Sequence, residues 1–418
     1  MAAADRRFRP FVFAPWLLVA LLVSACDTLE IGGDRQPSTS GPPVATEPLP
    51  EGGAAEGASG VTLRPGGPPA PAADAVRVGL LLPLSGPQAG LGKAMLKAAE
   101  LALFDLGDQR FELLSYDTKG TPEGAEAAAQ TALGDGSTLL LGPLLSSSAR
   151  AVAPVAGAAG VPVVSFSSDR TVAGSGVYVL GFTPEAEVRR VMGHAAEAGL
   201  TRMAVLAPQD AYGNAVVSEA KQVAGSLGAR LVRVQFYDPA GRDFGPAVEA
   251  VARAQASGSS PPFDALLIAD GGERLRAVGA QLPVHGVQQP TVRVLGTGAW
   301  DDPAVGTEPA LVGGWFAAPS PAYRESFQSQ YRDAFGQQPP RLATLAYDAT
   351  ALAAVLAASP SYLPFDRSAI EDPKGFLGRD GIFRFGPDGI VQRGLAVLEV
   401  DRGGSHVISE PPTAFGGS

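Results

Sequence analysis

The stretch Val76-Arg77-Val78-Gly79-Leu80-Leu81-Leu82-Pro83-Leu84-Ser85-Gly86 decides the fold of this 418-residue chain. Its first part is a nearly continuous apolar run, which is typical of a strand buried on both faces of a sheet. Pro83 and Gly86 then close the strand with a turn. Further apolar residues recur at helical spacing: Met95, Ala99, Ala102 and Leu106. The segment therefore predicts a buried strand followed by an amphipathic helix.

The same alternation of strand and helix continues to residue 296. The strand-like runs are Phe111–Tyr116, Thr138–Leu141, Val161–Ser165, Met203–Ala207, Arg230–Phe236, Ala265–Ala269 and Val292–Leu295. Helical stretches lie between them, near 122–134, 147–159, 184–198, 213–227, 244–257 and 273–282. Buried strands that alternate with amphipathic helices predict an α/β fold, with parallel sheets covered by helices on both faces. We expect one such unit over 76–180 and a second over 200–296.

The last third of the chain has a different pattern. Two further helices are expected near 321–335 and 341–357. The runs 381–385 and 390–400, joined by the Gly386–Gly389 turn, predict a hairpin-like end. Residues 359–378 are rich in loop-forming residues and have no assignment.

The N-terminus has the composition of a secretory signal. An apolar run, residues 11–23, follows three arginines and is shorter than the roughly 20 residues that cross a bilayer. The run ends in Leu22-Val23-Ser24-Ala25-Cys26, which resembles a bacterial lipobox, in which the cysteine is acylated. We expect residues 1–25 to be a lipoprotein signal peptide and Cys26 to be the lipidation site. The alternative is an ordinary signal peptide with an incidental cysteine.

A segment without aromatic residues follows, rich in Pro, Gly, Ala and Ser. Such a composition cannot bury enough apolar surface to offset the entropy of ordering. Residues 26–75 are therefore expected to be the lipidated cysteine and a disordered tether, which serves either as a true spacer or only as filler before the first domain.

Charge and cysteine content exclude several classes of function. The formal net charge is −10, and without residues 1–25, which carry three Arg and one Asp, it is near −12. An acidic chain is a poor candidate for nucleic-acid binding, which needs clustered Lys and Arg. It is also a poor candidate for adhesion to anionic lipid, so we expect membrane contact through the lipid anchor only. Cys26 is the only cysteine, so no disulfide is expected.

No motif for catalysis, a cofactor or a metal stands out. The three histidines lie far apart, without Cys, Asp or Glu at metal-ligand spacing. The glycines after the first strand lack the G-x-G-x-x-G spacing of a dinucleotide site. Ser218-Glu219-Ala220-Lys221 matches S-x-x-K, but the companion S-D-N and K-T-G elements are missing, so we interpret it as a turn of a surface helix. We expect no enzyme, no metal and no cofactor.

Polar and aromatic residues gather instead in loops after six of the predicted strands. Ligands of open α/β sheets bind outside the carboxyl ends of the strands. The candidate ligand-binding residues are Ser85, Ser146, Ser147, Ser148, Ser165, Ser167, Ser168, Asp169, Tyr212, Asp270, Glu273 and Trp300. Any one of these loops can be explained by helix capping alone. Serine hydroxyls and helix N–H groups together form an anion-tolerant polar pocket, and six such loops favour a cleft.

These landmarks resemble the leucine/isoleucine/valine-binding protein family, the type I periplasmic-binding clamshell, over about residues 76–400. The landmarks are Gly79–Gly86, Ser146–Ser148, Val161–Ser167, Tyr212-Gly213, Asp243-Phe244, Ala346–Asp348 and Asp388-Gly389. The resemblance implies two lobes, three inter-lobe crossovers, a ligand cleft and no catalysis. We expect lobe 1 over 76–182 and 316–378, lobe 2 over 183–315 and 379–408, and a tail over 409–418.

The resemblance also implies roles for some of the candidate residues. Amino-acid binders of this family would hold the ligand carboxylate with Ser147 or Ser148 and with Ser167 through Asp169, and the ammonium with Asp270 or Glu273. The chain departs from the family at Asp169, where threonine is expected. A carboxylate that faces the ligand carboxylate is unfavourable, unless Asp169 points away as a helix cap.

The chain also looks like the penicillin-binding protein activators, which are outer-membrane lipoproteins with the same fold. Gly142-Pro143-Leu144, Gly181–Glu185 and the Leu80–Gly86 opening carry this likeness. Two functions follow, and we expect the first: a regulator of peptidoglycan synthesis whose partner is a peptidoglycan synthase. The alternative is the substrate-binding protein of an ABC-type amino-acid transporter, with an ABC permease as partner and a small polar ligand such as an amino acid.

Both functions predict a periplasmic location with a lipid anchor in the outer or the inner membrane. Asp27 directly follows Cys26, and in some bacteria an aspartate there retains a lipoprotein at the inner membrane.

Overall fold

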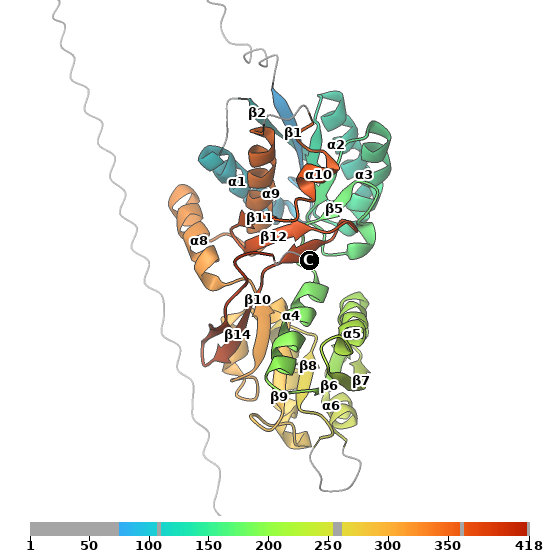
Figure 1. Cartoon of the computed structure of the whole chain (residues 1–418), viewed down its shortest axis with the longest axis vertical. Coiled ribbons are helices and arrows are strands. Elements are labelled where there is room, and N and C mark those ends of the chain that lie inside the picture. Colours follow the sequence, from blue (N-terminus) through green and yellow to red (C-terminus); the bar gives the residue numbers. More distant parts are fainter. Residues whose placement is uncertain (1–74, 107–109, 254–260, 360–362, 416–418) are drawn as a thin grey trace, which may run out of the picture. The chain divides into compact units, whose positions relative to one another are not determined.

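Two mainly parallel sheets, one in each lobe, organise the chain in the computed structural model (Figure 1). The structure describes residues 75–106, 110–253, 261–359 and 363–415, which all belong to one unit, residues 68–418. The predicted signal peptide, Cys26 and the tether up to residue 74 lie outside the described residues. Within the described ranges, no helix is both long and apolar enough to cross a bilayer.

The lobe 1 sheet is built around the stretch that opens the domain. The strand order is β2 (Phe111–Asp117), β1 (Val76–Leu82), β3 (Leu139–Leu141), β4 (Val163–Ser165) and β5 (Val177–Val179), and all pairs are parallel. The helices of this lobe are α1 (Ala89–Leu106), α2 (Pro122–Gly134), α3 (Ser146–Ala159), α8 (Pro321–Phe335), α9 (Ala343–Ala357) and α10 (Arg367–Ile370).

Both faces of β1 are buried, as its apolar run predicts. Val78, Leu80 and Leu82 belong to a core cluster with α1 and α9, whereas Leu81 belongs to a second cluster with α2 and α3. Successive side chains of a strand point to opposite faces, so a continuous apolar run suits a sheet covered on both sides.

The lobe 2 sheet has seven strands. Their order is β15 (Gly404–Ser409), β14 (Ala396–Asp401), β10 (Trp315–Ala318), β9 (Arg293–Gly296), β8 (Ala265–Ile268), β6 (Arg202–Pro208) and β7 (Arg230–Tyr237). The last two strands of the chain, β14 and β15, run antiparallel. Helices α4 (Pro184–Glu197) and α5 (Ala211–Ala224) cover one face, and α6 (Gly245–Ala252) and α7 (Gly272–Gln281) cover the other.

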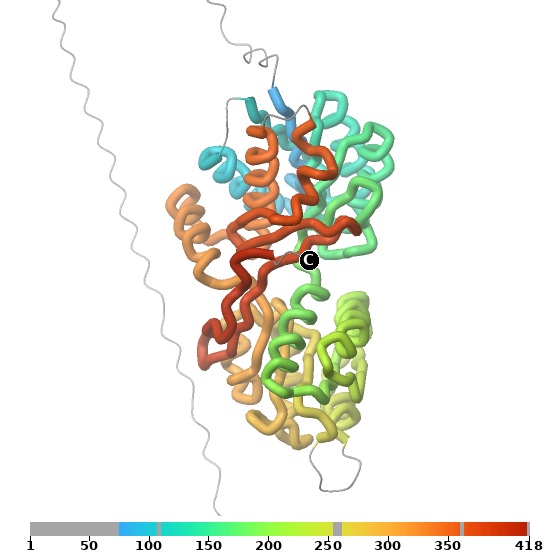
Figure 2. Tube along the Cα trace, in the orientation of Figure 1, coloured from blue at the N-terminus to red at the C-terminus, as the bar shows by residue number. Residues whose placement is uncertain are grey.

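The chain crosses between the lobes three times (Figure 2). It passes to lobe 2 between β5 and α4, returns between β10 and α8, and passes again between β13 (Val391–Arg393) and β14. A small antiparallel sheet of β11 (Phe376–Gly378), β12 (Gly381–Phe385) and β13 lies before the last crossing. Its side chains Phe383, Phe385 and Val391 join the lobe 1 core.

These crossings shift two of the expected domain boundaries. The sequence-based boundary at 316 falls inside β10, which is a strand of the lobe 2 sheet. The boundary at 379 precedes β12 and β13, which pack on lobe 1. The expected tail at 409–418 overlaps the end of β15, and Arg190 donates a hydrogen bond to the Ser409 hydroxyl at 2.7 Å.

The prediction of a hairpin-like end is also corrected by the structure. The expected strand 390–400 consists of two strands, β13 and β14, separated by Gly394 and Leu395 and assigned to different sheets. The sequence-based assignments also lacked β5, β10, β11, β15 and α10. Four of these have only three or four residues, which is too short for a periodic pattern.

Candidate functional site

A cavity of about 720 Å³ lies between the lobes and is the candidate functional site. Lobe 1 contributes the start of α3 and the short 3-10 helix η1 (Arg170–Val172); lobe 2 contributes the first turn of α4 and one side of α5. The lining residues are Ser146, Arg150, Ser168, Asp169, Arg170, Thr171, Pro184, Glu185, Ala211, Tyr212, Asn214, Ala215, Ser218 and Glu219. The loops after β3, β4 and β6 thus reach the cavity at the carboxyl ends of their strands.

The cavity brings together four of the twelve candidate residues: Ser146, Ser168, Asp169 and Tyr212. The first three come from lobe 1 and the last from lobe 2. They lie beyond three different strands, so the rule that ligands bind at the carboxyl ends of parallel strands explains how the sheets gather them.

The N-terminus of α3 faces this cavity at Ser146. The residue before it, Leu145, occupies the N-cap position and has no side-chain oxygen that could accept hydrogen bonds from the first turn. The N–H groups of a helix N-terminus carry partial positive charge and favour an anion. This wall of the cavity can therefore receive a carboxylate.

Asp169 also lines the cavity, but its carboxylate has partners within lobe 1. Its carboxylate caps η1 by accepting a hydrogen bond from the Thr171 N–H at 2.9 Å, and it also accepts one from Arg150 at 2.6 Å. Burial works to raise the pKa of Asp169, but the bonds from Thr171 and Arg150 outweigh it and lower the pKa. The charge of Asp169 is thus paired within lobe 1.

Five other serines of the candidate set lie outside the cavity lining. Ser165 and Ser167 are buried, and the Ser165 hydroxyl donates to the carbonyl of Pro143, in the loop after β3, at 3.1 Å. The Ser148 hydroxyl donates to the Thr121 carbonyl at 3.3 Å, toward α2. Ser85 and Ser147 are exposed. A serine-rich loop therefore supplies structural hydrogen bonds at most of these positions.

In lobe 2, Tyr212 is the candidate residue that reaches the cavity. Its hydroxyl and the Thr297 hydroxyl are 2.6 Å apart, and burial is the main cause of a raised Tyr212 pKa. Asp270 is buried and bonded to Tyr237, to Arg274 and to the Gly271 N–H. Asp270 is not among the lining residues, and neither are the exposed Glu273 and the buried Trp300.

Sequence reasoning missed ten of the lining residues, and seven of these are polar or charged: Arg150, Arg170, Thr171, Glu185, Asn214, Ser218 and Glu219. Most of them lie on helices, whereas the predicted site residues lie mainly in the loops directly after strands. Two signals were present: Glu185 ends the Gly181–Glu185 landmark, and Ser218 and Glu219 belong to the S-x-x-K match. The match lies on α5 with Ser218 exposed, as a turn of a surface helix predicts, and Ser218 also lines the cavity.

Two glutamates form the acidic part of the lobe 2 wall. The Glu185 side chain is 12% exposed, and one of its oxygens is 3.8 Å from Arg170 of lobe 1. Its other oxygen, Oε2, is buried without a hydrogen-bond partner. The Glu219 side chain is 1% exposed and bonds to Arg189 at 2.5 Å. Burial, with help from the charge of Glu219, raises the pKa of Glu185.

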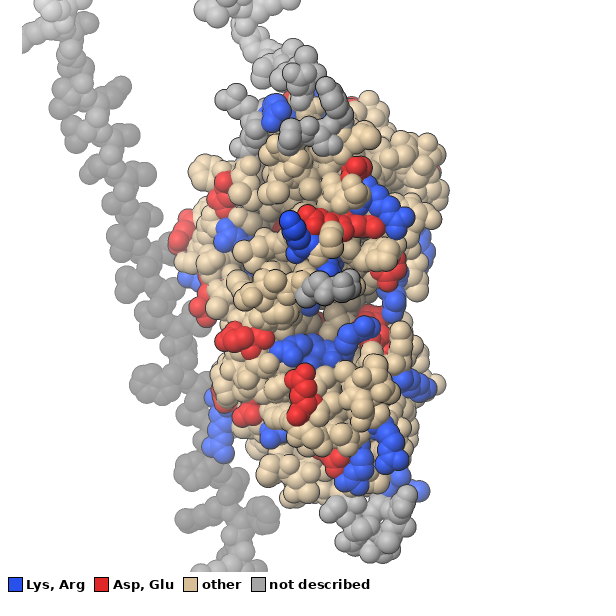
Figure 3. Space-filling model, in the orientation of Figure 1, with Lys and Arg blue, Asp and Glu red and all other residues tan. Residues whose placement is uncertain are grey.

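Basic side chains gather on the face shown in Figure 3 at the level where the lobes meet. The chain as a whole is acidic, so this concentration is local. Within the described residues, no group of three or more His, Cys, Asp or Glu side chains is placed to hold a metal ion.

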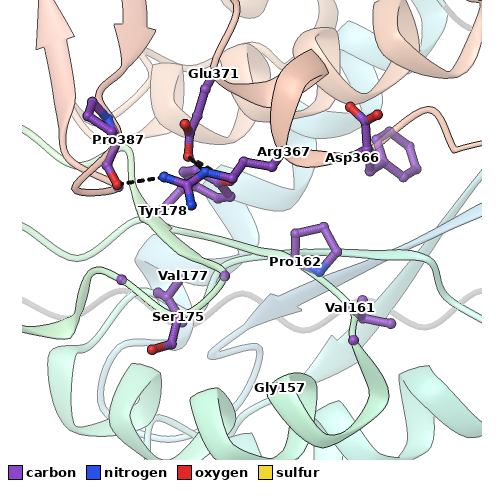
Figure 4. A pocket seen from close by; sticks show the side chains of 15 residues that line it. Gly157, Val161, Pro162, Ser175, Val177, Tyr178, Asp366, Arg367, Glu371 and Pro387 are labelled. Carbon is purple, nitrogen blue, oxygen red and sulfur yellow. Dashed lines mark hydrogen bonds and ion pairs between the residues drawn. The ribbon is translucent and has the colours of Figure 1, made fainter.

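A second, smaller cavity of about 340 Å³ lies in lobe 1, at the amino ends of β4 and β5 (Figure 4). Its charged groups pair with each other: Arg367 bonds to Glu371 at 2.9 Å and to the Pro387 carbonyl at 3.0 Å. Glu371 also accepts a hydrogen bond from the Tyr178 hydroxyl at 3.2 Å. This position and pairing make it a weaker candidate than the inter-lobe cavity.

A family model described as periplasmic binding protein matches residues 75–405. No curated protein matches the chain significantly. The match covers both lobes and every lining residue of the inter-lobe cavity.

Solved structures with the same architecture come from several bacteria. A branched-chain amino acid ABC transporter protein from Rhodospirillum rubrum is 22% identical, with a TM-score of 0.71 over 80% of this chain and 100% of that one. The branched-chain amino acid substrate-binding protein of Streptococcus pneumoniae, in complex with isoleucine, is 17% identical, with a TM-score of 0.55 over 80% and 99%. A solute-binding protein of an ABC transporter from Rhodopseudomonas palustris, in complex with 3,4-dihydroxybenzoic acid, is 21% identical, with a TM-score of 0.56 over 81% and 99%. At these identities the likeness establishes the two-lobed fold.

Proposed function

Because this chain belongs to the family of periplasmic binding proteins, we propose that it is the solute-binding component of an ABC-type transporter. Its ligand is a small molecule with a carboxylate, and its protein partner is an ABC permease. The observation that carries the proposal is the cavity of about 720 Å³ lined by both lobes.

The lobe 1 wall supports a ligand with a carboxylate. The α3 N-terminus offers N–H groups at Ser146, which lines the cavity. Such a helix N-terminus favours negative charge. Arg150 of the same helix also lines the cavity, where its charge is paired with Asp169. Isoleucine and 3,4-dihydroxybenzoic acid, the ligands of two proteins with this fold, both contain a carboxylate.

The regulator of peptidoglycan synthesis, which the sequence analysis placed first, has less support than the transport function. One argument for the regulator was that Asp169 would repel a ligand carboxylate. The pairing of Asp169 with Arg150 and Thr171 removes that argument. Two of the solved structures described above are proteins of ABC transporters, and the third is a substrate-binding protein of a branched-chain amino acid transporter.

Ligand binding can be tested by the thermal and chemical stability of the purified protein. A panel of small carboxylates, with amino acids and aromatic acids, is added in turn. A ligand at 100 times its dissociation constant should raise the free energy of unfolding by about 2.7 kcal/mol. If no compound of the panel raises the stability of the protein, the result would contradict the transport function.

The variant Ser146→Pro tests the role of the α3 N-terminus. Proline is tolerated at the first position of a helix, and Leu145 already has the extended backbone that precedes proline (φ −90°, ψ 143°). The substitution removes one N–H donor but keeps the helix, so ligand affinity should fall about tenfold. Ser146→Ala, which keeps the N–H, is the control, and equal affinities of the two variants would contradict the role of this N–H.

We also propose that Cys26 anchors the protein to a membrane of the cell envelope through an acyl group. The lipobox-like sequence Leu22–Cys26 supports this anchor. Cys26→Ala should move the protein from the membrane fraction to the soluble fraction or block its processing. Unchanged fractionation, with no acyl label on the wild-type protein, would contradict the proposal.

A further inference from the structure

We propose that a proton on Glu187 holds the two lobes together, and that loss of this proton favours an arrangement in which the lobes lie further apart. Glu187 is not part of the cavity lining, so it acts as a positioning residue and not as a group that binds the ligand. The proposal goes beyond the transport function, because it concerns how readily the cavity closes and does not depend on which solute enters it.

Glu187 lies where the lobes meet. It belongs to the first turn of α4, which begins directly after the first crossing, and it is 8% exposed. On the lobe 2 side, its Oε2 accepts a hydrogen bond from the Gly298 N–H at 2.9 Å. On the lobe 1 side, the charges of Arg341 and Arg393 act on it, and both guanidinium groups stack on Phe182 of the first crossing. A change in the separation of the lobes therefore changes the contact of this carboxyl group with water.

The two arginines do not offset the burial of Glu187 by hydrogen bonds. Within the described residues, Arg341 donates to Asp380 at 3.2 Å, and Arg393 donates to the Leu180 carbonyl at 2.6 Å. The Nε and Nη1 atoms of Arg393 are buried and have no partner among these residues. An ionised carboxylate that is buried with a single backbone N–H is poorly stabilised. Burial accordingly raises the pKa of Glu187 to about 7, against the effects of that N–H and of both arginines.

Other titratable groups act on Glu187 from lobe 2. Glu185 of the same helix turn adds a like charge, which also favours the protonated form. Tyr212 of α5 interacts with Glu187, and its hydroxyl is 2.6 Å from that of Thr297, the neighbour of Gly298. Because Tyr212 lines the cavity, Glu187 and this part of the cavity wall belong to one hydrogen-bonded group and should move together.

Asp348 is a second buried carboxyl group, and it serves as an internal comparison. It lies in α9 and is 1% exposed, and its Oδ1 accepts a hydrogen bond from the Arg379 N–H at 2.6 Å. Burial and the charge of Asp380 raise the pKa of Asp348 to about 7. These partners pack with Asp348 in lobe 1, so a separation of the lobes should leave its surroundings in place.

The direction of the pH effect follows from the linkage between proton binding and lobe separation. Separation admits water to Glu187, so its pKa falls toward the ordinary value of 4.5. The proton is bound more strongly when the lobes are together, and a rise in pH through this range therefore favours the separated lobes. Each unit of difference between the two pKa values changes the ratio of the two arrangements up to about tenfold. A ligand that contacts both walls should bind more tightly at low pH.

Single-molecule fluorescence energy transfer measures the separation without ligand. The mature protein, with Cys26→Ser, carries two dyes on the exposed substitutions Gln130→Cys in α2 of lobe 1 and Gln222→Cys in α5 of lobe 2. We expect the ratio of separated to joined lobes to rise at least fivefold between pH 5 and pH 8. A ratio that does not change with pH would overturn the proposal.

Three variants assign the effect to one carboxyl group. Glu187→Gln mimics the protonated group, so the ratio should stay at its low-pH value at every pH. Glu187→Asp keeps a titratable group and should retain a pH-dependent ratio. Asp348→Asn is the matched control, and the fivefold change should persist in it. Melting temperatures verify that each variant is folded.

The same pH response in Glu187→Gln and the wild type would overturn the assignment to Glu187. Loss of the response in Asp348→Asn alone would place the proton in lobe 1 and would also overturn it. No ligand is present in these measurements, so the transport function is judged separately by the panel of carboxylates.

Discussion

Glu187 is a buried carboxyl group beside the first crossing between the lobes. Its Oε2 accepts a hydrogen bond from the Gly298 N–H at 2.9 Å. Two cations lie near it: Arg341 and Arg393 stack on the ring of Phe182, at 4.0 and 4.7 Å from its centroid. Burial raises the pKa of Glu187 to about 7, against the opposing effects of the Gly298 N–H and the two guanidinium groups. The carboxyl group thus takes up a proton on folding when the pH lies between its ordinary value and 7.

Replacement of Glu187 by Gln should change how stability depends on pH. In the wild type, the raised pKa stabilises the fold fully below pH 4.5, the ordinary value, and this contribution is lost as the pH rises to about 7. Glutamine mimics the protonated group at every pH. Urea unfolding is measured at pH 5, 6, 7 and 8. Over that range, the free energy of unfolding of the variant should rise relative to that of the wild type by about 3 kcal/mol, because each unit of pKa shift corresponds to about 1.4 kcal/mol. A difference that stays constant with pH would contradict the prediction.

Helix α5 forms most of the lobe 2 wall of the cavity, and its position depends on a close contact at its start. Gly213 lies in the first turn, where a Cβ atom would come within 2.0 Å of the Pro208 carbonyl oxygen at the end of β6. Its N–H also donates to the capping carboxylate of Asp210 at 2.8 Å. The absence of a side chain at this position lets the helix begin directly at the end of the strand, with Tyr212 on the cavity.

Gly213→Ala should therefore push α5 away from β6. We expect a loss of about 1–3 kcal/mol in the free energy of unfolding, typical of overpacking, together with weaker ligand binding. Gly225→Ala at the other end of α5 is the control. Its φ of −64° suits alanine and no atom lies within 4 Å of the added Cβ, so stability should be unchanged or higher by about 0.4–1 kcal/mol. Chemical unfolding of both variants checks this, and equal stabilities would disprove the close-contact argument.

At the scale of the whole molecule, ion pairs add to the three crossing segments in joining the lobes. Asp301, which follows a 3-10 helix of lobe 2, accepts hydrogen bonds from Arg324 of α8 in lobe 1. The two side chains are 13% and 17% exposed. Two longer contacts also cross between the lobes: Arg341 lies 3.9 Å from Asp301, and Arg170 lies 3.8 Å from Glu185. The first pair is well shielded from solvent, so it should contribute more to stability than a surface pair does.

Asp301→Asn should leave Arg324, whose side chain is 17% exposed, without its charged partner. We expect the free energy of unfolding to fall by roughly 3 kcal/mol, near the lower end for breaking a buried pair. Glu249→Gln removes an exposed pair with Arg253, whose side chains are 60% and 71% exposed, and should change stability by less than about 0.5 kcal/mol. Urea unfolding of the two variants is the measurement. Similar losses in both would contradict a special role for the inter-lobe pair.

Local sequence patterns were sufficient to predict the strands and helices that have the same surroundings along their whole length. The run Val76–Leu82 predicts a strand buried on both faces, and the spacing of Met95, Ala99 and Ala102 predicts the buried side of α1. Such patterns persist because every residue of the element meets the same surroundings. The strands β5 and β11, with three residues each, are too short to show a pattern of their own.

The sequence by itself determined that this chain builds parallel sheets covered by helices in two lobes. The reason is that the spacing of apolar residues along the chain shows which segments are strands and which are helices. Only the tertiary structure decided that β13 and β14 belong to different sheets, that Asp169 pairs with Arg150, and that Glu185 and Glu219 meet at one wall of the cavity. These outcomes depend on which distant segments pack against each other. Hydrogen bonds and ion pairs across such contacts produce no regular spacing of residues in the sequence. The orientation of a polar side chain is therefore fixed only when the lobes are assembled.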